Sequence, residues 1–526
     1  MTGTGKLIRL ILRRDRAVLP LWVLVFGLLP LAYFASLEGI FKTEADRIAY
    51  ASASSGNAGF VALYGLLKGD SFAAMTAWRA GFVPVMIGLA ALLTVIRHTR
   101  TDEEAGRTEL IGATVVGRQA QLAAALITTS VASLLVGLLT FAGMAGKSGD
   151  TAGSLAFGAE LAVSGLMFAG VAAVTAQLTS SARSARSLAV VVLGVAYALR
   201  VGGDIAALGD GGPSWLSWLS PLGWVTHIFP YGGTNWWPVL VGVVFAIAAV
   251  TGGVYLRSHR DLGDGTFAAR LGPPVAPAWL GTPFALAWRL HRGLLIGWTV
   301  GLSLLGVIFG GVGGSVVDIA KESENVGDLF TRLGGGSDQL VNSYFAGIAA
   351  IVGLIASCYA VQAALRMRDE ETSGHAEAVL STAVSRSAWA GSHLLFSLLG
   401  PAVALLAEGV VTALVSPDGS FGGIVGSAVI QLPAIWVISG VTVLLFGLMP
   451  RWSPAAWAAP ALCLLILLVG STLQLDQWFL DISPFTHVPH LPGVEVPATP
   501  VVTLVAVAVV LAAAGLFGLR RRNLPD

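Results

Sequence analysis

Residues 97–118 read RHTRTDEEAGRTELIGATVVGR, and residues 366–386 read RMRDEETSGHAEAVLSTAVSR. Both stretches hold Asp-Glu-Glu, then a Gly, then a Glu three residues after that Gly and an Arg nine residues after that Glu. Long apolar runs flank each stretch, so each is expected to form a polar loop between two membrane spans. Because one chain carries this charged loop twice, the sequence predicts that the two loops bind a partner with two-fold symmetry.

The composition around these loops is that of a membrane protein. The chain has 526 residues, of which 55% are hydrophobic and 12% charged, and its mean hydropathy is +0.77. A soluble protein of this length could not bury so much apolar surface, so we expect an all-α, polytopic membrane protein. The net charge of +1 gives no reason to expect nucleic-acid binding. Cys358 and Cys463 both lie in apolar runs, and no disulfide is expected.

Twelve apolar runs are long enough to cross a bilayer. The run 17–36 follows basic residues, as in a signal peptide, but its length favours a retained first span. We expect six spans in each half of the chain, at 17–36, 80–96, 120–144, 154–178, 187–208 and 238–256, and then at 291–313, 345–365, 389–416, 424–448, 455–473 and 500–519.

The basic residues predict the orientation of these spans. Most of the 31 Lys and Arg lie on segments that face one side when the N-terminus is placed inside. Both termini and both charged loops are therefore expected in the cytoplasm.

The duplication extends beyond the charged loops. Three residues just before or within the first span match three residues just before or within the seventh span, with the same number of residues between the partners of each pair. Ser220-Pro221 also matches Ser483-Pro484. These three pairs are Arg13 with Arg289, Arg16 with Arg292, and Trp22 with Trp298. Because six spans are an even number, the two halves are expected to be parallel repeats. We divide the chain into residues 1–256, a Gly- and Pro-rich cytoplasmic linker 257–283, and residues 284–526.

A basic segment precedes the first span. Lys6, Arg9, Arg13 and Arg16 fall on one face of a helix, with Leu7, Leu10 and Ile11 beside them. This pattern is typical of an amphipathic helix in the inner membrane interface. Anchoring by positive charge alone is an equally good interpretation.

Within the first charged loop, Thr101 and Glu104 have the spacing of a capping box. This predicts a short helix from about residue 102 that ends near Gly106. Short charged helices of this kind can dock into a groove on a soluble partner. The alternative is a solvated loop that only turns the chain, but the duplication favours docking.

The loops resemble the cytoplasmic coupling segment of type-two ABC exporter permeases, which reads roughly Arg-Glu-x-x-Gly-Thr-x-Glu followed by an Arg. The residues that carry the resemblance are Glu104, Gly106, Glu109 and Arg118 in the first loop, and Glu371, Gly374, Glu377 and Arg386 in the second. The fused twelve-span form is similar to actinobacterial permeases that export polyketide antibiotics and other drugs. The chain departs from many relatives in having Val115-Val116 and Ala383-Val384 where they have Pro.

This resemblance implies a transport subunit in the cell membrane and no enzyme activity in the chain itself. It implies two copies of a separate ATP-binding subunit, which would hold ATP and magnesium, and a lipophilic substrate. It also implies that the second and fifth spans of each half line the pathway. The sequence itself agrees that ATP is bound elsewhere, because it contains no G-x-x-x-x-G-K-[ST] motif, the phosphate-binding loop of ATPases. Gly146-Lys147-Ser148 comes nearest, but Phe occupies position 141. We expect no cofactor on this chain.

Four charged residues lie inside predicted spans, namely Glu160, Arg200, Asp204 and Glu408. Arg200 and Asp204 are one helical turn apart and can pair, and Glu160 could also reach Arg200. Glu408 has no basic residue near it in its half. Such residues usually face a protein interior or water, so they are either structural or part of a polar patch near an outer gate. His487 and His490 form H-x-x-H without a third ligand, and no metal site is expected.

Two other classes of protein share some of these features. A secondary, proton-coupled transporter also suits twelve spans in two parallel halves, but the duplicated cytoplasmic loop argues against it. A membrane-embedded transferase would need a cluster of acidic or His residues at one membrane face, and the sequence contains none that we recognise.

Overall fold

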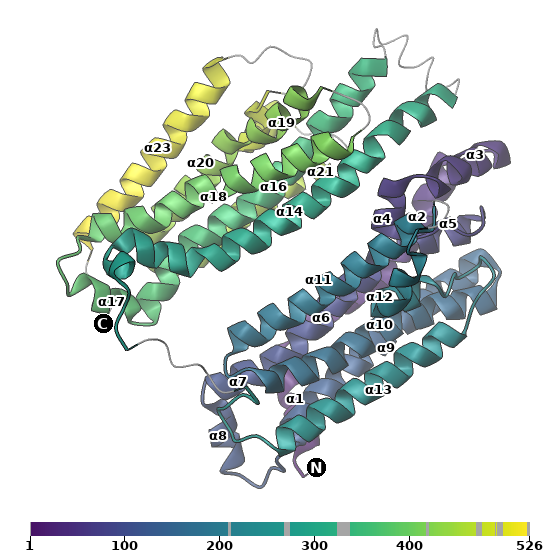
Figure 1. The fold of residues 1–526 in the computed structure, drawn as a ribbon, viewed down its shortest axis with the longest axis horizontal. Helices are drawn as coiled ribbons and strands as arrows, with labels where there is room; N and C mark the ends of the chain where they lie inside the picture. The colour runs from purple at the N-terminus through teal and green to yellow at the C-terminus, as the bar shows by residue number, and fades with distance from the viewer. Residues whose placement is uncertain are drawn as a thin grey trace. The chain divides into compact units, whose positions relative to one another are not determined.

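The computed structural model describes residues 2–208, 212–267, 274–322, 337–416, 420–469, 476–489, 491 and 498–522. In these ranges every regular element is a helix and no strand occurs. The chain divides into two compact units, Met1–Gly272 and Pro273–Asp526, and each is described by itself. Figure 1 shows the helices of both units.

Unit 1 consists of long helices with short helices at both of their ends. Its elements are α1 (Thr4–Arg14), α2 (Val18–Ile40), α3 (Glu44–Ser55), α4 (Ala58–Tyr64), α5 (Phe72–Arg79), α6 (Val83–His98), α7 (Arg100–Glu104), α8 (Arg107–Gly112), α9 (Ala120–Ser148), α10 (Thr151–Leu178), α11 (Ala182–Ala206), η1 (Ser214–Leu219), α12 (Pro221–Thr226) and α13 (Trp237–Ser258). Helices α7 and α8 and the N-terminus lie at one end of the unit, and α3 to α5 lie at the other (Figure 1). Residues 37–79, which join the first two predicted spans, are largely helical.

Helix α10 is the centre of unit 1. It packs against α6, α9, α11 and α13. In its most apolar stretch, 83% of the residues are buried. Small residues permit this close packing, since a Cβ placed on Gly137 of α9 would lie 2.4 Å from the carbonyl oxygen of Gly158 on α10. The helices that surround α10 leave their outer faces exposed, as expected for contact with lipid.

Unit 2 has the elements η2 (Ala278–Gly281), α14 (Pro283–Glu322), α16 (Ser337–Thr372), α17 (His375–Leu380), α18 (Arg386–Val415), α19 (Phe421–Val429), α20 (Leu432–Leu448), η3 (Pro450–Trp457), α21 (Ala458–Val469), α22 (Gln477–Leu480), η4 (Pro484–His487) and α23 (Ala498–Arg521). Helices α14 and α16 pack on α18, and α20 packs on α23. A Cβ on Gly447 of α20 would lie 1.9 Å from the carbonyl oxygen of Gly515 on α23, so both positions need Gly.

Within the described residues, eleven helices are long and apolar enough to cross a membrane. They coincide with eleven of the predicted spans, and the chain is a multi-pass membrane protein. The remaining prediction, 455–473, is represented by part of η3 and by the short helix α21, and residues 470–475 lie outside the described residues. The twelve-span count, the parallel repeat and the cytoplasmic termini therefore stay predictions. His490 also lies outside the described residues.

Candidate functional site

The first charged loop lies at one end of unit 1, where α6, α7 and α8 meet. Helix α6 ends at His98, and the chain then forms α7, a turn at Gly106 and α8. Gly106 has φ +69°, in the left-handed region that glycine adopts at little cost. The second loop is similar, because α16 runs on to Thr372, Gly374 has φ +75°, and α17 follows.

Glu103 in α7 is the polar centre of the first loop. Its carboxylate accepts hydrogen bonds from both terminal nitrogens of Arg260, at 2.7 and 2.6 Å. The backbone N–H of Gly263 donates to the same carboxylate at 2.9 Å, and Arg100 forms a second ion pair with it at 3.1 Å. Glu103 and Arg260 are both buried. A buried carboxylate is stable only when it is paired and hydrogen-bonded, and this one is.

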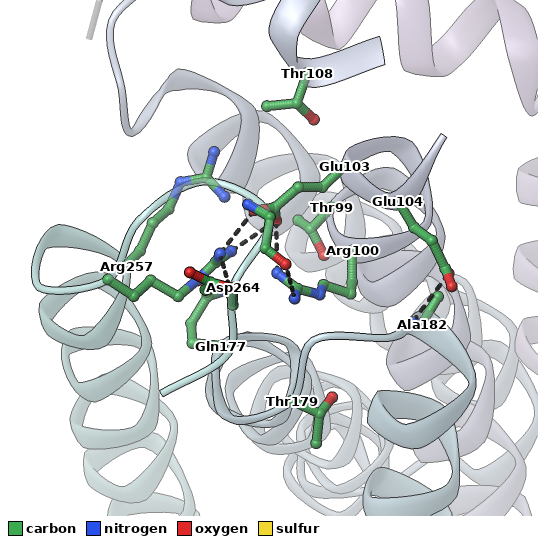
Figure 2. Close-up of polar contacts among 12 residues, drawn as sticks. Thr99, Arg100, Glu103, Glu104, Thr108, Gln177, Thr179, Ala182, Arg257 and Asp264 are labelled. Atoms are coloured by element: carbon green, nitrogen blue, oxygen red, sulfur yellow. Dashed lines mark hydrogen bonds and ion pairs between the residues drawn. The ribbon is translucent and has the colours of Figure 1, made fainter. Parts of the chain in front are cut away.

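Arg260 belongs to the segment 259–267, which follows the last long helix of unit 1. Its Nε donates to Oε1 of Gln177 at 2.8 Å, and Nη1 donates to the carbonyl oxygen of Asp264 at 2.8 Å. Figure 2 shows that Glu103, Gln177 and Asp264, which all accept hydrogen bonds from Arg260, lie close together. The backbone N–H groups of Thr266 and Phe267 donate to the carbonyls at the end of α10. The first part of the predicted linker is therefore folded onto the charged loop.

Unit 2 repeats this contact with other residues. Glu371 accepts hydrogen bonds from both terminal nitrogens of Arg522, at 2.5 and 2.8 Å. Arg522 follows α23, the last helix of unit 2, as Arg260 follows α13, the last long helix of unit 1. We name each of these pairs a Glu–Arg clamp.

The arginine that ends each loop completes the arrangement. Arg118 donates to the carbonyl oxygen of Arg260 at 2.6 Å, and Arg386 donates to the carbonyl oxygen of Arg522 at 2.6 Å. Both ends of each loop are thus fastened to the same residue, which lies just beyond the last long helix of that unit.

The clamps identify a residue that the sequence analysis missed. Glu103 precedes Gly106 by three residues, and Glu371 precedes Gly374 by three. The structural counterpart of Glu371 is therefore Glu103, whereas the sequence analysis had selected Glu104. Counting back from the Gly, as in the resembling Glu-x-x-Gly pattern, would have found it.

Glu104 itself contacts α11. Its carboxylate accepts the backbone N–H of Ala182 at 3.1 Å, in the first turn of that helix (Figure 2). The predicted capping box is wrong, because α7 begins after Thr99 and no side chain caps it. The Thr101 hydroxyl instead donates to the Ile96 carbonyl and accepts a hydrogen bond from Arg186.

The tips of the loops are exposed. Glu109 and Glu377 lie on the surface, and neither has an ion-pair partner in the part of the chain that the structure describes. Leu110 is 75% exposed and Val115 is 87% exposed. Residues at the matching positions of the second loop, Ala378 and Ala383, are also exposed but small. Helices α8 and α17 therefore each present one exposed acid, and the first loop adds two large apolar side chains.

Helix α1 braces the first loop from the N-terminal side. Arg14 donates to Asp102 at 2.7 Å, and Arg107 donates to the other oxygen of the same carboxylate at 2.8 Å. The hydrogen bond to Asp102 raises the pKa of Arg14 above its ordinary value. The predicted amphipathic helix is thus part of the same polar network as the loop.

The four charged residues predicted inside spans are all buried. Arg200 and Asp204 form the expected ion pair at 3.6 Å, and Arg200 also donates to the carbonyls of Val61 and Leu63. This pair holds α4 against α11. Among the described residues, Glu160 forms no ion pair with Arg200, and it lines a cavity of about 20 Å³, enough for one water molecule.

Glu408 lies on α18 in unit 2, and its carboxylate accepts a hydrogen bond from Thr412 at 2.9 Å. No basic side chain pairs with it in the described residues. In the same residues, no group of three or more His, Cys, Asp or Glu is placed to hold a metal ion.

Long apolar helices with polar loops anchored at their ends define a multi-pass membrane protein. The family model described as "Multidrug efflux system permease Rv1217c, C-terminal domain" matches residues 5–256 and 280–520. The chain is 43% identical over 530 residues to the multidrug efflux system permease protein Rv1217c of Mycobacterium tuberculosis (strain ATCC 25618 / H37Rv). The alignment covers 99% of this chain and 95% of that protein. The chain belongs to this family of multidrug efflux permeases.

Proposed function

We propose that the chain is the transmembrane subunit of an ATP-driven exporter of lipophilic, drug-like compounds. Two copies of a separate ATP-binding subunit would dock on the two charged loops from the cytoplasm and hydrolyse ATP there. The membership in a multidrug efflux permease family supports the transport of drug-like compounds. The ATP-driven mechanism rests on the charged loops.

One observation carries this proposal, namely that both units build the same clamp beneath an exposed acid. In each unit, a buried Glu and the arginine that ends the loop bind the residue just beyond the last long helix. A loop held in this way moves together with that helix, so a force applied at its tip reaches the membrane-spanning part. A loop that merely turned the chain would not need two such attachments.

The exposed residues supply the docking surface. Glu109 and Glu377 can form charge-assisted contacts with a basic groove, each contributing about 1.5–3 kcal/mol if buried. Glu104 and Glu371 are engaged within their own units and serve the loop's shape. Because only the first loop adds the exposed apolar side chains Leu110 and Val115, whose burial on docking is favourable, we expect it to bind the ATP-binding subunit more tightly.

The composition of the complex tests this proposal. Tagged protein would be purified from its native membranes in mild detergent, and the mass of the intact complex measured. We expect one permease chain with two ATP-binding subunits. A complex with two permease chains, or a permease without any ATP-binding subunit that still exports drugs, would contradict it.

A proton-coupled secondary transporter is the second candidate, and the buried acids Glu160 and Glu408 favour it. Drug efflux from cells separates the two mechanisms. An ionophore that abolishes the proton gradient while ATP is maintained should leave ATP-driven export intact. Depletion of ATP with the gradient maintained should stop it.

A further inference from the structure

A groove on unit 1 has no role in the arrangement described so far. It has a volume of about 400 Å³ and lies between α1, α2 and α9. Its walls are apolar and include Ile8 and Leu12 from α1, Leu19 and Val23 from α2, and Val131 and Leu135 from α9. The Thr128 hydroxyl in its wall donates to the Ala124 carbonyl and is therefore satisfied. The groove offers an apolar molecule contact without competing hydrogen bonds, and its volume lies in the range of ligand sites.

The bend between α1 and α2 shapes this groove. The chain leaves the helical conformation between Arg14 and Val18, where the buried Asp15 is held by His98 at 2.5 Å and Arg97 at 3.2 Å. Both helices then pack separately on α9. The groove opens outward, since Val131 is 49% exposed and Leu135 is 44% exposed. An apolar groove that opens outward beside a membrane-spanning helix can admit a lipid chain.

The polar end of the groove carries net positive charge. Asp15 is neutralised by its two partners, and Arg14 is paired with Asp102. Arg16 lines the groove, is exposed, and has no ion-pair partner in the described ranges. Lys6, Arg9 and Arg13 on α1 are exposed as well and pair with no described acid. The apolar groove therefore has one free cation, Arg16, in its lining, and the neighbouring helix α1 carries three more.

We propose that this groove is a binding site for one anionic phospholipid. An acyl chain lies along the apolar walls, and the phosphate sits at the polar end beside Arg16. A helix with free cations beside an apolar face suits the interface of a membrane that contains anionic lipids. A zwitterionic lipid of the same chain length fills the same walls but gains less from the arginine. The site does not depend on how transport is energised.

Native mass spectrometry of the full chain in detergent tests this site. Dioleoyl phosphatidylglycerol and dioleoyl phosphatidylcholine would be titrated separately, and the affinity of the tightest-bound lipid compared. We expect phosphatidylglycerol to bind more tightly, and Arg16→Gln to weaken its binding about five-fold and that of phosphatidylcholine less. Val131→Trp, which fills the groove from an exposed position, should weaken both lipids at this site.

Two control variants keep the test specific. Arg451→Gln removes an exposed arginine in unit 2, and Val244→Trp places the same ring on an exposed face of α13. Both should bind phosphatidylglycerol as the wild type does. Equal affinity of the wild type for the two lipids would overturn the proposal, and so would unchanged phosphatidylglycerol binding in Val131→Trp. Drug export can fail or persist in these variants without affecting either conclusion.

Discussion

The carboxylate of Glu371 binds the guanidinium of Arg522 through both of its oxygens, across 151 residues of sequence. Glu371 is 2% exposed at its side chain and Arg522 is 14% exposed. Arg522 also rests over the ring of Phe446, 4.9 Å from its centre. The end of α23 is therefore fixed to the second charged loop by charge, hydrogen bonds and an aromatic contact together.

This pair should be coupled energetically. Removing one partner leaves a buried charge without compensation, which costs about 3 kcal/mol or more. We expect Glu371→Ala and Arg522→Ala each to destabilise the protein, and the double variant to lose less than the sum of the two. Unfolding of the purified protein in detergent would measure this. The pair of Arg47 with Glu44, whose glutamate side chain is 76% exposed, is the control, since the coupling between its two partners should not be measurable.

Gly374 should tolerate few substitutions, although there is room around it. No atom lies within 4 Å of a Cβ placed there, so the cost comes from its φ of +75° alone. We expect Gly374→Ala to cost about 1–2 kcal/mol and Gly374→Asn to cost less, because Asn adopts this conformation more readily.

Gly112 is the matched control for this prediction. It is exposed at the end of α8, and a Cβ there also meets nothing. Because its backbone is helical, Gly112→Ala should be neutral or stabilising. Thermal unfolding of the three variants compares them, and equal losses at Gly374 and Gly112 would argue against backbone strain as the cause.

The exposed acids should affect binding of the partner and not the stability of the fold. Glu109→Ala and Glu377→Ala remove surface charges without described partners, so each should change stability by less than about 0.5 kcal/mol. If the loops dock on an ATP-binding subunit, the double variant should lose co-purification of that subunit, or hydrolyse ATP without exporting drug. Normal export by the folded double variant would contradict the docking role.

The residues of the sequence repeat revealed much of this site, but the clamp partners needed the structure. The recurring spacing made four residues of the site recognisable, namely Gly106, Gly374, Arg118 and Arg386. Arg260 had been counted as part of a linker, because no local pattern shows that residues 259–267 fold back onto α7 and α10. Glu103 was passed over since Asp-Glu-Glu offers three adjacent acids, and the three-residue spacing to Gly106, which singles out the acid that binds Arg260, was not used.

The long helices were predictable for a simpler reason. Apolar runs of about 20 residues specify membrane spans by length and composition alone. The short helices α3 to α5 were not, because residues 37–79 carry mixed charges and no sustained period. Their positions depend on tertiary contacts, such as the hydrogen bonds from Arg200 to the carbonyls of Val61 and Leu63.

The membrane topology can be tested at the exposed ends of both loops. Ala113 and Ser381 are exposed in the structure, and the positive-inside pattern places both in the cytoplasm. In a background without Cys358 and Cys463, single cysteines at these two positions should react with a membrane-impermeant thiol reagent only after the cells are opened. Labelling of either site in intact cells would overturn the parallel arrangement of the halves.

Glu408 should influence which compounds are exported. It is 3% exposed on α18, its described hydrogen-bond partner is Thr412, and no basic side chain balances it in the described residues. Buried acids in membrane spans usually face a pathway or a protein interior. If Glu408 faces the pathway, Glu408→Gln should reduce export of cationic compounds about ten-fold, the effect of one charge-assisted contact, and should spare neutral ones. Efflux of matched cationic and neutral dyes, normalised to the amount of folded protein, measures this.

Two variants separate that role from a structural one. Thr412→Val removes the hydroxyl that donates to Glu408 but keeps the charge, so it should preserve the preference for cations. Glu160→Gln removes a buried acid from α10 in unit 1 and shows whether any buried acid has the same effect. Because glutamine keeps the size and hydrogen bonding of the side chain, loss of folded protein should be small. If Glu408→Gln lowers both classes of dye in proportion to the protein level, Glu408 stabilises α18 and does not select the substrate.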